Sequence, residues 1–405
     1  MAHLNVDVGG RPGFDCLGFC EYCYFKQAED TPPFGCRYCL PYKKGCDYCN
    51  RGVKEGYSGF MDLKSVANNV LADLQMIQDD LTRINISGGG DPSCYPELYD
   101  LVDLLGQLET PLHIGYTSGK GFREREIGRV LMDNNLSEIS YTIFSADPEK
   151  RRRYMRDPSP EISLQVLEDL CAEIDVYTAA VIIPGVNDGE DIIRTCEWLE
   201  EKGAKGLILM RFANNIQQGL ILGNAPIIKG IEVQAVEGFR DMVRDLNASF
   251  SMKISGTPLY DPEIGSPFAI LDEPELLEKL PVPEKKATVI TGSIAAPYIR
   301  KILDRKGFEG NVIGVEKEIA CLITIDDLSG IDHSELEELV VIPGRAFVHD
   351  MEVQQLLGGD RKVLRGPEML TADAETSMGM DRNGVLRMEM DGFSGLINII
   401  NQNGN

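Results

Sequence analysis

Three cysteines near the start of the chain have the types and spacing to hold an iron–sulfur cluster. Cys16, Cys20 and Cys23 follow the pattern C-x3-C-x2-C on one short loop. A cubic cluster contains four irons, so three thiolates leave one iron without a cysteine and free to bind a substrate. The alternative interpretation is a structural zinc loop. It is weaker, because three close cysteines without a nearby fourth ligand make a poor closed tetrahedral site.

A second group of cysteines follows directly and could fill a metal shell by itself. Its members, in the pattern C-x2-C-x6-C-x2-C, are Cys36, Cys39, Cys46 and Cys49. Four thiolates complete a tetrahedral shell, which is usual for a structural metal. Thiolates suit both zinc and iron, so ligand type does not separate these metals. The short connector favours a single metal ion over a second four-iron cluster. We expect no disulfides, because the chain shows no secretory segment.

The spacing of the first three cysteines resembles the cluster loop of the radical S-adenosylmethionine (SAM) enzymes. An aromatic residue just before the last cysteine, here Tyr22, is also typical of that superfamily. The resemblance implies a [4Fe-4S] cluster on Cys16, Cys20 and Cys23. It also implies that the amino and carboxylate groups of SAM chelate the open iron.

Composition limits the class of protein. The chain has 405 residues, of which 43% are hydrophobic, and this length predicts two or three domains with a sizeable core. Its net charge of −24 argues against a nucleic-acid partner, because binding phosphates requires clustered Lys and Arg. The apolar runs are too short to cross a membrane, and the first residues carry no apolar signal core. We therefore expect a cytoplasmic protein.

Six strand–helix units are predicted in the first 250 residues, and they indicate an α/β fold with a parallel sheet. Strand–helix crossovers are right-handed, so the sheet should curl into a partial (β/α)6 barrel with its chemistry at the carboxyl ends of the strands. The expected strands are 4–8, 83–87, 113–117, 138–144, 176–183 and 206–212. The expected helices are 62–81, with Asp62 as N-cap, 96–108, 124–134, 161–173, 191–202 and 232–246.

A glycine-rich turn follows the second predicted strand. Gly88, Gly89 and Gly90 permit close backbone approach and are followed by Asp91. In the radical SAM family a Gly-Gly-Glu-type segment at this place receives the amino group of SAM. The resemblance therefore implies that these glycines and Asp91 bind SAM. Asp in place of Glu shortens the reach of the carboxylate.

Three more strand ends carry candidate residues. Ser145, after the fourth strand, is placed to contact ribose, and Pro184 and Gly185, after the fifth, resemble the adenine-contacting stretch of the family. Tyr116 lies at the end of the third strand, with Lys120 in the loop just after it. Our hypothesis is that the phenolate of Tyr116 reaches the open iron when SAM is absent. A plain barrel tyrosine is the alternative.

The last third of the chain predicts a second, smaller α/β domain. We expect a radical SAM barrel over 1–250 with the four-cysteine loop inserted at 30–52, a linker over 251–286 and the C-terminal domain over 287–405. Two turns, at 291–293 and at 343–345, could cradle a phosphate or a cofactor tail, or could be ordinary strand-to-helix turns. The expected elements are strands 287–291, 311–315, 321–325 and 339–342, helices 295–306 and 351–357, and a hairpin with an Asn-Gly turn at 380–386.

The order of these parts resembles the methanogenesis marker protein 10 family over essentially the whole chain. The resemblance implies a cobalamin-dependent radical SAM methyltransferase that acts on the δ-carbon (C5) of an arginine in the α subunit of methyl-coenzyme M reductase. It implies a mononuclear iron on Cys36, Cys39, Cys46 and Cys49, an external electron donor, and methylcobalamin held by the C-terminal domain, with Thr291 and Gly292 in one of its turns. The Asp-x-His-x-x-Gly segment of many B12 proteins is absent. We therefore expect no histidine ligand to cobalt and an apolar contact such as Leu322 on its lower face.

The implied reaction must open an sp³ C–H bond, which acid–base chemistry cannot do. In the family the 5′-deoxyadenosyl radical takes the hydrogen, methylcobalamin supplies the methyl group, and a second SAM restores it. A substrate guanidinium needs a carboxylate partner, for which Asp157 and Glu375 are candidates, although either could be a solvated surface acid. Two alternatives remain. One is a radical SAM enzyme with an auxiliary cluster and no cobalamin, and the other is a non-catalytic zinc-binding interaction protein.

Overall fold

The computed structural model describes residues 2–28, 59–77 and 79–404, which form two compact units. The first contains the described residues of 2–28, 59–212 and 227–256, and the second contains 213–226 and 257–404. The four-cysteine motif at Cys36, Cys39, Cys46 and Cys49 lies outside the described residues, so its predicted metal site stays a prediction.

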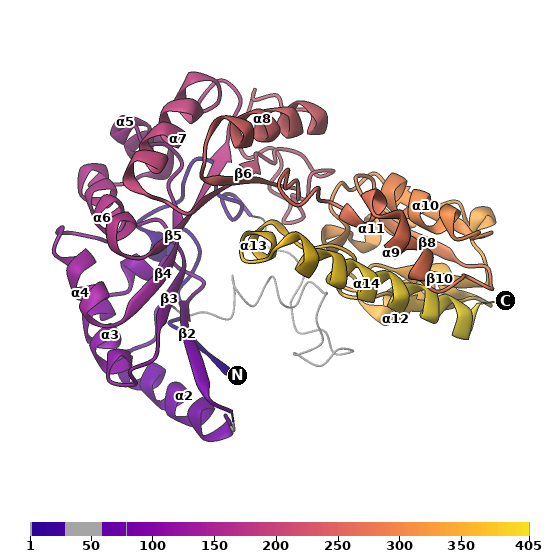
Figure 1. Cartoon of the computed structure of the whole chain (residues 1–405), viewed down its shortest axis with the longest axis horizontal. Coiled ribbons are helices and arrows are strands. Elements are labelled where there is room, and N and C mark those ends of the chain that lie inside the picture. The colour runs from indigo at the N-terminus through magenta and orange to yellow at the C-terminus, as the bar shows by residue number, and fades with distance from the viewer. Residues whose placement is uncertain (1, 29–58, 78, 405) are drawn as a thin grey trace. The chain divides into compact units, whose positions relative to one another are not determined.

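The first unit is built on a seven-stranded sheet in the sequential order β1 to β7 (Figure 1). Neighbouring strands from β1 to β6 are all parallel, which confirms the predicted α/β architecture. The strands are β1 (Ala2–Asp7), β2 (Leu81–Ser87), β3 (Leu112–Thr117), β4 (Leu136–Thr142), β5 (Asp175–Ile182), β6 (Gly206–Arg211) and β7 (Lys253–Thr257). Strand β7 lies in the segment that the sequence indicated as a linker.

Helices cover the outer side of this sheet (Figure 1). Apolar residues alternate along the strands, and those facing the helices, such as Ile84, Ile86 and Ile139, are fully buried. Asp62 caps the first of these helices as predicted, because its carboxylate accepts a hydrogen bond from the Ser65 backbone N–H at 2.9 Å. The helices are α2 (Leu63–Met76), α3 (Leu98–Gly106), α4 (Ile127–Asp133), α5 (Pro148–Lys150), α6 (Pro160–Glu173), α7 (Glu190–Lys202) and α8 (Val236–Ser249).

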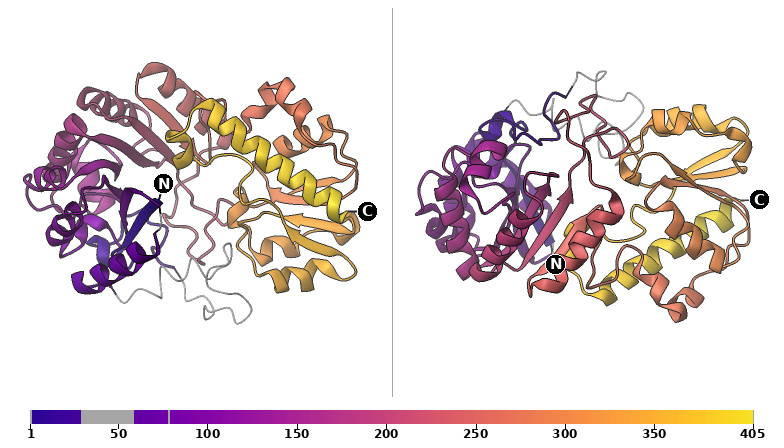
Figure 2. Two further views of the ribbon diagram at one scale, coloured as in Figure 1. Left: turned by 60° about the horizontal axis from the view of Figure 1, so that its bottom comes forward. Right: turned by 90° about the horizontal axis from the view of Figure 1, so that it is seen from above.

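The second unit is a four-stranded parallel sheet in the order β11-β10-β8-β9. The chain runs from β8 to β9 on one side and then returns to place β10 on the other side of β8. Apolar clusters cover both faces, and the long helix α14 packs on one of them (Figure 2). The elements are β8 (Thr288–Gly292), β9 (Asn311–Val315), β10 (Leu339–Ile342), β11 (Lys362–Arg365), α9 (Pro274–Lys279), α10 (Ala296–Arg305), α11 (Ile325–Ser329), α12 (Asp350–Val353), α13 (Ala374–Met378) and α14 (Arg382–Asn403).

Two predictions of secondary structure in the second unit are wrong, because each segment contains the N-cap of a helix. The expected strand 321–325 is replaced by the end of a 3-10 helix (Ala320–Leu322) and the start of α11, where the Thr324 backbone N–H donates to the Asp327 carboxylate at 2.7 Å in a capping box. The expected hairpin 380–386 is the start of α14, where Asp381 accepts a hydrogen bond from the Gly384 N–H at 2.6 Å. The Asn-Gly pair therefore lies in the first helical turn.

Among the described residues, no helix is both long enough and apolar enough to span a bilayer.

Candidate active site

The three-cysteine loop follows β1 and depends on glycine geometry. Gly13 adopts a positive φ of 79°, and a Cβ at this position would lie 2.1 Å from the ring of Phe19, so only glycine fits. The Gly13 N–H donates to the Cys16 Sγ at 3.3 Å, and the Cys20 thiol donates to the Met155 carbonyl at 3.4 Å. These two hydrogen bonds hold the thiols of Cys16 and Cys20 in place.

The three cysteine thiols of the loop lie close together. Among the described residues, no group of three or more His, Cys, Asp or Glu side chains is placed to hold a metal ion. The three thiols nevertheless lie close enough for Cys23 to raise the pKa of Cys16 and for Cys20 to raise that of Cys23. A cubic cluster requires this arrangement, because each thiolate binds a different iron. Zinc stays the alternative prediction for this loop.

Burial raises the pKa of all three thiols, to about 12 for Cys16 and about 11 for Cys23. The positive charge of Lys120 acts in the opposite direction and lowers the pKa of each thiol. Metal ligands must be thiolates, so a nearby cation favours the ligand form of the loop.

The predicted glycine turn packs against the end of β1. The backbone N–H groups of Gly89 and Gly90 donate to the Gly9 carbonyl at 2.9 and 3.2 Å. A Cβ on Gly88 would lie 2.5 Å from the same carbonyl, so the close approach requires glycine. The Asp91 N–H donates to the Asp15 carbonyl at 3.3 Å. The turn is therefore joined directly to the cysteine loop.

Asp91 has a different role from the one predicted. It is 6% exposed, and its carboxylate accepts hydrogen bonds from five donors. These donors are the Ser93 N–H (2.9 Å) and hydroxyl (2.8 Å), the Thr117 hydroxyl (2.7 Å), and the Ser118 N–H (3.0 Å) and hydroxyl. The internal donors occupy the carboxylate, so we assign Asp91 to joining the ends of β2 and β3 rather than to contacting SAM.

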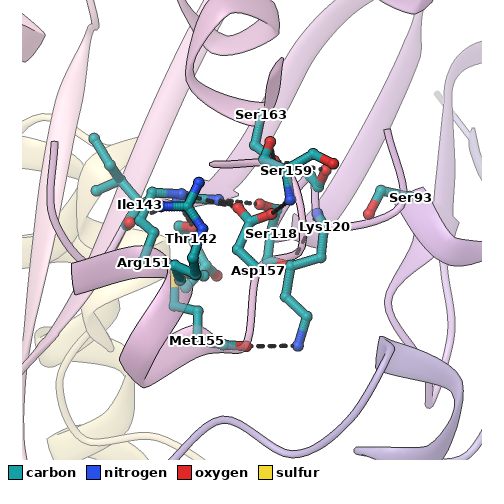
Figure 3. A network of polar contacts seen from close by, with 12 residues as sticks. Ser93, Ser118, Lys120, Thr142, Ile143, Arg151, Met155, Asp157, Ser159 and Ser163 are labelled. Atoms are coloured by element: carbon teal, nitrogen blue, oxygen red, sulfur yellow. Dashed lines mark hydrogen bonds and ion pairs between the residues drawn. The ribbon is translucent and has the colours of Figure 1, made fainter. Parts of the chain in front are cut away.

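Asp157, predicted to bind a substrate guanidinium, binds one inside the protein instead (Figure 3). Its Oδ2 accepts hydrogen bonds from Arg151 Nε at 3.1 Å and Nη2 at 2.8 Å, and both side chains are fully buried. Arg151 also donates to the carbonyls of Ser118 (2.8 Å) and Ile143 (2.6 Å). Asp157 is therefore unavailable to a substrate, and the prediction for this residue is wrong.

Lys120 is the residue of this site that sequence reasoning placed correctly but gave no role. It is 1% exposed, and its Nζ donates to the carbonyls of Met155 at 2.8 Å and Gly18 at 3.0 Å (Figure 3). The same nitrogen lies 3.9 Å from the Cys20 Sγ. Its position in a turn between two glycines was the only signal in the sequence.

Tyr116 and Tyr22 present aromatic groups near the strand ends of this unit. Tyr116 is 41% exposed and has a positive φ of 47° beside an irregularity in the β3–β4 pairing. Such strained backbone is often found at functional sites. Tyr22 stacks on Phe144 with ring centroids 4.9 Å apart. The contact between Tyr116 and iron stays a prediction.

The remaining predicted SAM contacts lie after β4 and β5. Ser145 is fully buried, and its hydroxyl accepts a hydrogen bond from the Asp147 N–H at 3.0 Å. Gly185 is exposed with φ 75°, and its N–H donates to the Asp188 carboxylate at 3.0 Å. The adjacent Pro184 is half-buried. Their contacts with ribose and adenine stay predictions.

The second unit contains a largely apolar cavity of about 470 Å³ at the carboxyl ends of β8 and β10. Thr291, Leu322 and the Pro343-Gly344-Arg345 turn line it, as does Cys321. In doubly wound sheets, ligands bind where the strand order reverses, here between β8 and β10. Gly292 packs beneath this region, where a Cβ would lie 2.6 Å from the Glu318 carbonyl.

Glu375, the other candidate for the substrate guanidinium, is exposed in the first turn of α13 in the second unit. Its role stays a prediction.

A parallel strand–helix sheet with a three-cysteine loop after β1 and a glycine turn after β2 defines a radical SAM domain. Comparison with family models agrees: residues 11–199 match the Radical SAM superfamily. This part of the chain is therefore similar to that superfamily. A search of curated proteins found no match.

Solved structures that resemble the chain have low sequence identity. A domain of pyruvate-formate lyase-activating enzyme from Bacteroides vulgatus is 17% identical with a TM-score of 0.33, over 43% of this chain and 98% of that one. SuiB from Streptococcus suis, bound to precursor peptide SuiA, is 13% identical with a TM-score of 0.41, over 67% and 52%. A radical SAM methyltransferase from Sphaerobacter thermophilus is 13% identical with a TM-score of 0.36, over 62% and 64%. The chain thus spans about half of SuiB.

The buried ion pair predicts a large loss of stability in the Asp157→Ala variant. Removing one partner leaves the Arg151 charge buried without compensation, which costs about 3–5 kcal/mol of unfolding free energy. Denaturant unfolding of the first unit, followed by circular dichroism, measures this loss. Glu149→Ala, which breaks an exposed ion pair with Arg152, should leave stability nearly unchanged. Equal stability of the two variants would contradict the assignment.

Asp91→Glu tests whether this carboxylate holds the fold or contacts SAM. An extra methylene does not fit among five internal donors, so we expect a loss of about 1–3 kcal/mol in unfolding free energy together with weaker SAM binding. Thermal unfolding and equilibrium binding of SAM measure the two effects. A glutamate variant with unchanged stability and full SAM affinity would instead support direct contact.

Proposed function

We propose that this chain is a cobalamin-dependent radical SAM methyltransferase that methylates the δ-carbon (C5) of an arginine in the α subunit of methyl-coenzyme M reductase. The proposal rests on the likeness to the methanogenesis marker protein 10 family. The observation that best supports it is that one chain contains both a cluster-type cysteine loop in a radical SAM domain and an apolar cavity at the switch point of a second parallel sheet.

The cavity supports the proposal of a cofactor site in the second unit. Its volume of about 470 Å³ and apolar lining are typical of cofactor pockets. Leu322 would give the corrin an apolar lower contact, and no histidine lines the cavity in the described part of the chain. The Thr291 and Gly344 turns would hold polar side groups of the cofactor.

The residues of the chain hold, orient and shield the reacting groups. Cys16, Cys20 and Cys23 would hold the [4Fe-4S] cluster, and the turn at Gly88–Gly90 would receive the amino group of SAM. When bound, the cluster with SAM supplies the radical that opens the C–H bond, and methylcobalamin supplies the methyl group. Glu375 remains our candidate for pairing with the substrate guanidinium. The four-cysteine motif would hold a mononuclear iron, and an external donor supplies electrons.

The direct test is anaerobic incubation of the protein with cobalamin, SAM, a reductant and an arginine-containing reductase peptide. Mass spectrometry should show the gain of one methyl group, accompanied by both 5′-deoxyadenosine and S-adenosylhomocysteine. Deoxyadenosine without methylation would reject the substrate or the cobalamin. Absence of SAM cleavage by protein that holds its cluster would reject the enzyme.

Metal analysis distinguishes the proposal from a radical SAM enzyme with an auxiliary cluster. The proposed cofactors amount to about five irons plus one cobalt per chain, because one four-iron cluster accompanies a mononuclear iron. Two four-iron clusters would instead give about eight irons, and without cobalamin no cobalt would be present.

Leu322→His tests the position of cobalamin. An imidazole placed under the corrin should coordinate cobalt and shift the visible absorption of the bound cofactor. Val282→His, at an exposed site of the same unit, is the matched control and should leave the spectrum unchanged. Identical spectra for Leu322→His and the wild type would contradict the proposed site.

A further inference from the structure

Lys120 places a buried positive charge against the cysteine loop. Its side chain is 1% exposed, yet within the described part of the chain no carboxylate lies at ion-pair distance from its ammonium. Its hydrogen-bond acceptors are the backbone carbonyls of Met155 and Gly18 and, at 3.9 Å, the Cys20 Sγ. A buried charge is normally paired, because desolvation makes an isolated one costly. The position therefore suits a lysine whose counter-charge is not a carboxylate.

The cysteine loop lies where a negative charge that balances the Lys120 ammonium is expected. Gly18 lies between two of the cysteines, and the Met155 carbonyl accepts hydrogen bonds from both Lys120 and the Cys20 thiol. The Lys120 Nζ lies 3.9 Å from the Cys20 Sγ. With thiolates bound to iron, this loop carries negative charge that the ammonium would compensate.

The backbone on both sides of Lys120 is tightly packed, which fixes the point from which its side chain extends. A Cβ on Gly119 would lie 1.8 Å from the Tyr141 hydroxyl, and one on Gly121 would lie 1.8 Å from the Ser93 carbonyl. Both flanking positions thus require glycine.

Three other cations of this unit, Arg151, Arg11 and Lys26, differ from Lys120 because each has a carboxylate partner. Asp157 neutralises Arg151 at 2.8 Å, Asp15 lies 3.3 Å from Arg11, and Glu21 pairs with Lys26. Paired charges have weak effects at a distance, whereas an unpaired charge in a low-dielectric interior acts strongly on its surroundings. Of these four cations, Lys120 is therefore the one suited to influence a redox centre.

We propose that Lys120 stabilises the one-electron-reduced form of the cluster held by Cys16, Cys20 and Cys23, and so raises the potential at which it accepts an electron. The electron comes from the external one-electron donor, which is oxidised, and the cluster gains one negative charge without a bond being made or broken. A fixed ammonium beside Cys20 lowers the energy of the more negative state. This inference rests on the cluster in the proposed function.

The test is a potentiometric titration of the full-length, cluster-loaded protein without SAM, followed by electron paramagnetic resonance of the reduced cluster. Lys120→Gln keeps a donor for the two carbonyls but removes the charge. We expect at least a tenfold lower ratio of reduced to oxidised cluster at a given potential, equivalent to about 59 mV for one electron. Lys120→Arg keeps the charge and should behave within about threefold of the wild type, about half of that shift.

Lys26→Met is the matched control, because it removes a lysine three residues after Cys23 whose charge is already paired with Glu21. It should change the ratio far less than Lys120→Gln. Equal ratios in Lys120→Gln and the wild type would overturn the inference. Loss of the cluster in Lys120→Gln but not in Lys120→Arg would also overturn it, by assigning Lys120 to loop assembly alone.

The iron content and spectrum of the wild-type protein keep the two proposals separate. A four-iron signal in the wild type with an unshifted potential in Lys120→Gln would reject the role of Lys120 and leave the proposed function intact. A wild-type protein without a four-iron cluster would reject both.

Discussion

The buried ion pair between Arg151 and Asp157 is the interaction on which the candidate site depends. Through its guanidinium, Arg151 joins the end of β3, at the Ser118 carbonyl, to the end of β4, at the Ile143 carbonyl. The pair fixes the turn that carries Met155. The Met155 carbonyl accepts hydrogen bonds from the Lys120 ammonium and from the Cys20 thiol. This buried ion pair thereby helps to position Cys20, which is far from Arg151 and Asp157 in the sequence.

Two carboxylates that the sequence suggested as functional residues have structural roles. Asp91 and Asp157 both lie in loops at the carboxyl ends of strands, where chemistry is expected, and both are consumed by internal donors. Their burial makes the loops rigid, and rigid loops are what a SAM site and a cluster need. The acids therefore act by positioning the backbone of these loops.

The sequence predicted the first sheet well because strands with alternating buried residues and helices with regular apolar spacing recur in order. The cysteine loop and glycine turn were also readable, since their spacing is itself the signal. The partners of Asp157 and Lys120 were not readable, because contacts such as Lys120 with Gly18 join residues far apart in the chain. Local capping by Asp381 likewise overrode the turn preference of the Asn-Gly pair.

The central claim is that three cysteines leave one iron open for SAM beside the glycine turn. Electron nuclear double resonance on the reduced protein, with SAM labelled with ¹⁵N in its amino group and ¹⁷O in its carboxylate, tests this most directly. The account predicts hyperfine coupling of the cluster spin to both labels. A well-reduced four-iron signal without coupling to either label would contradict it.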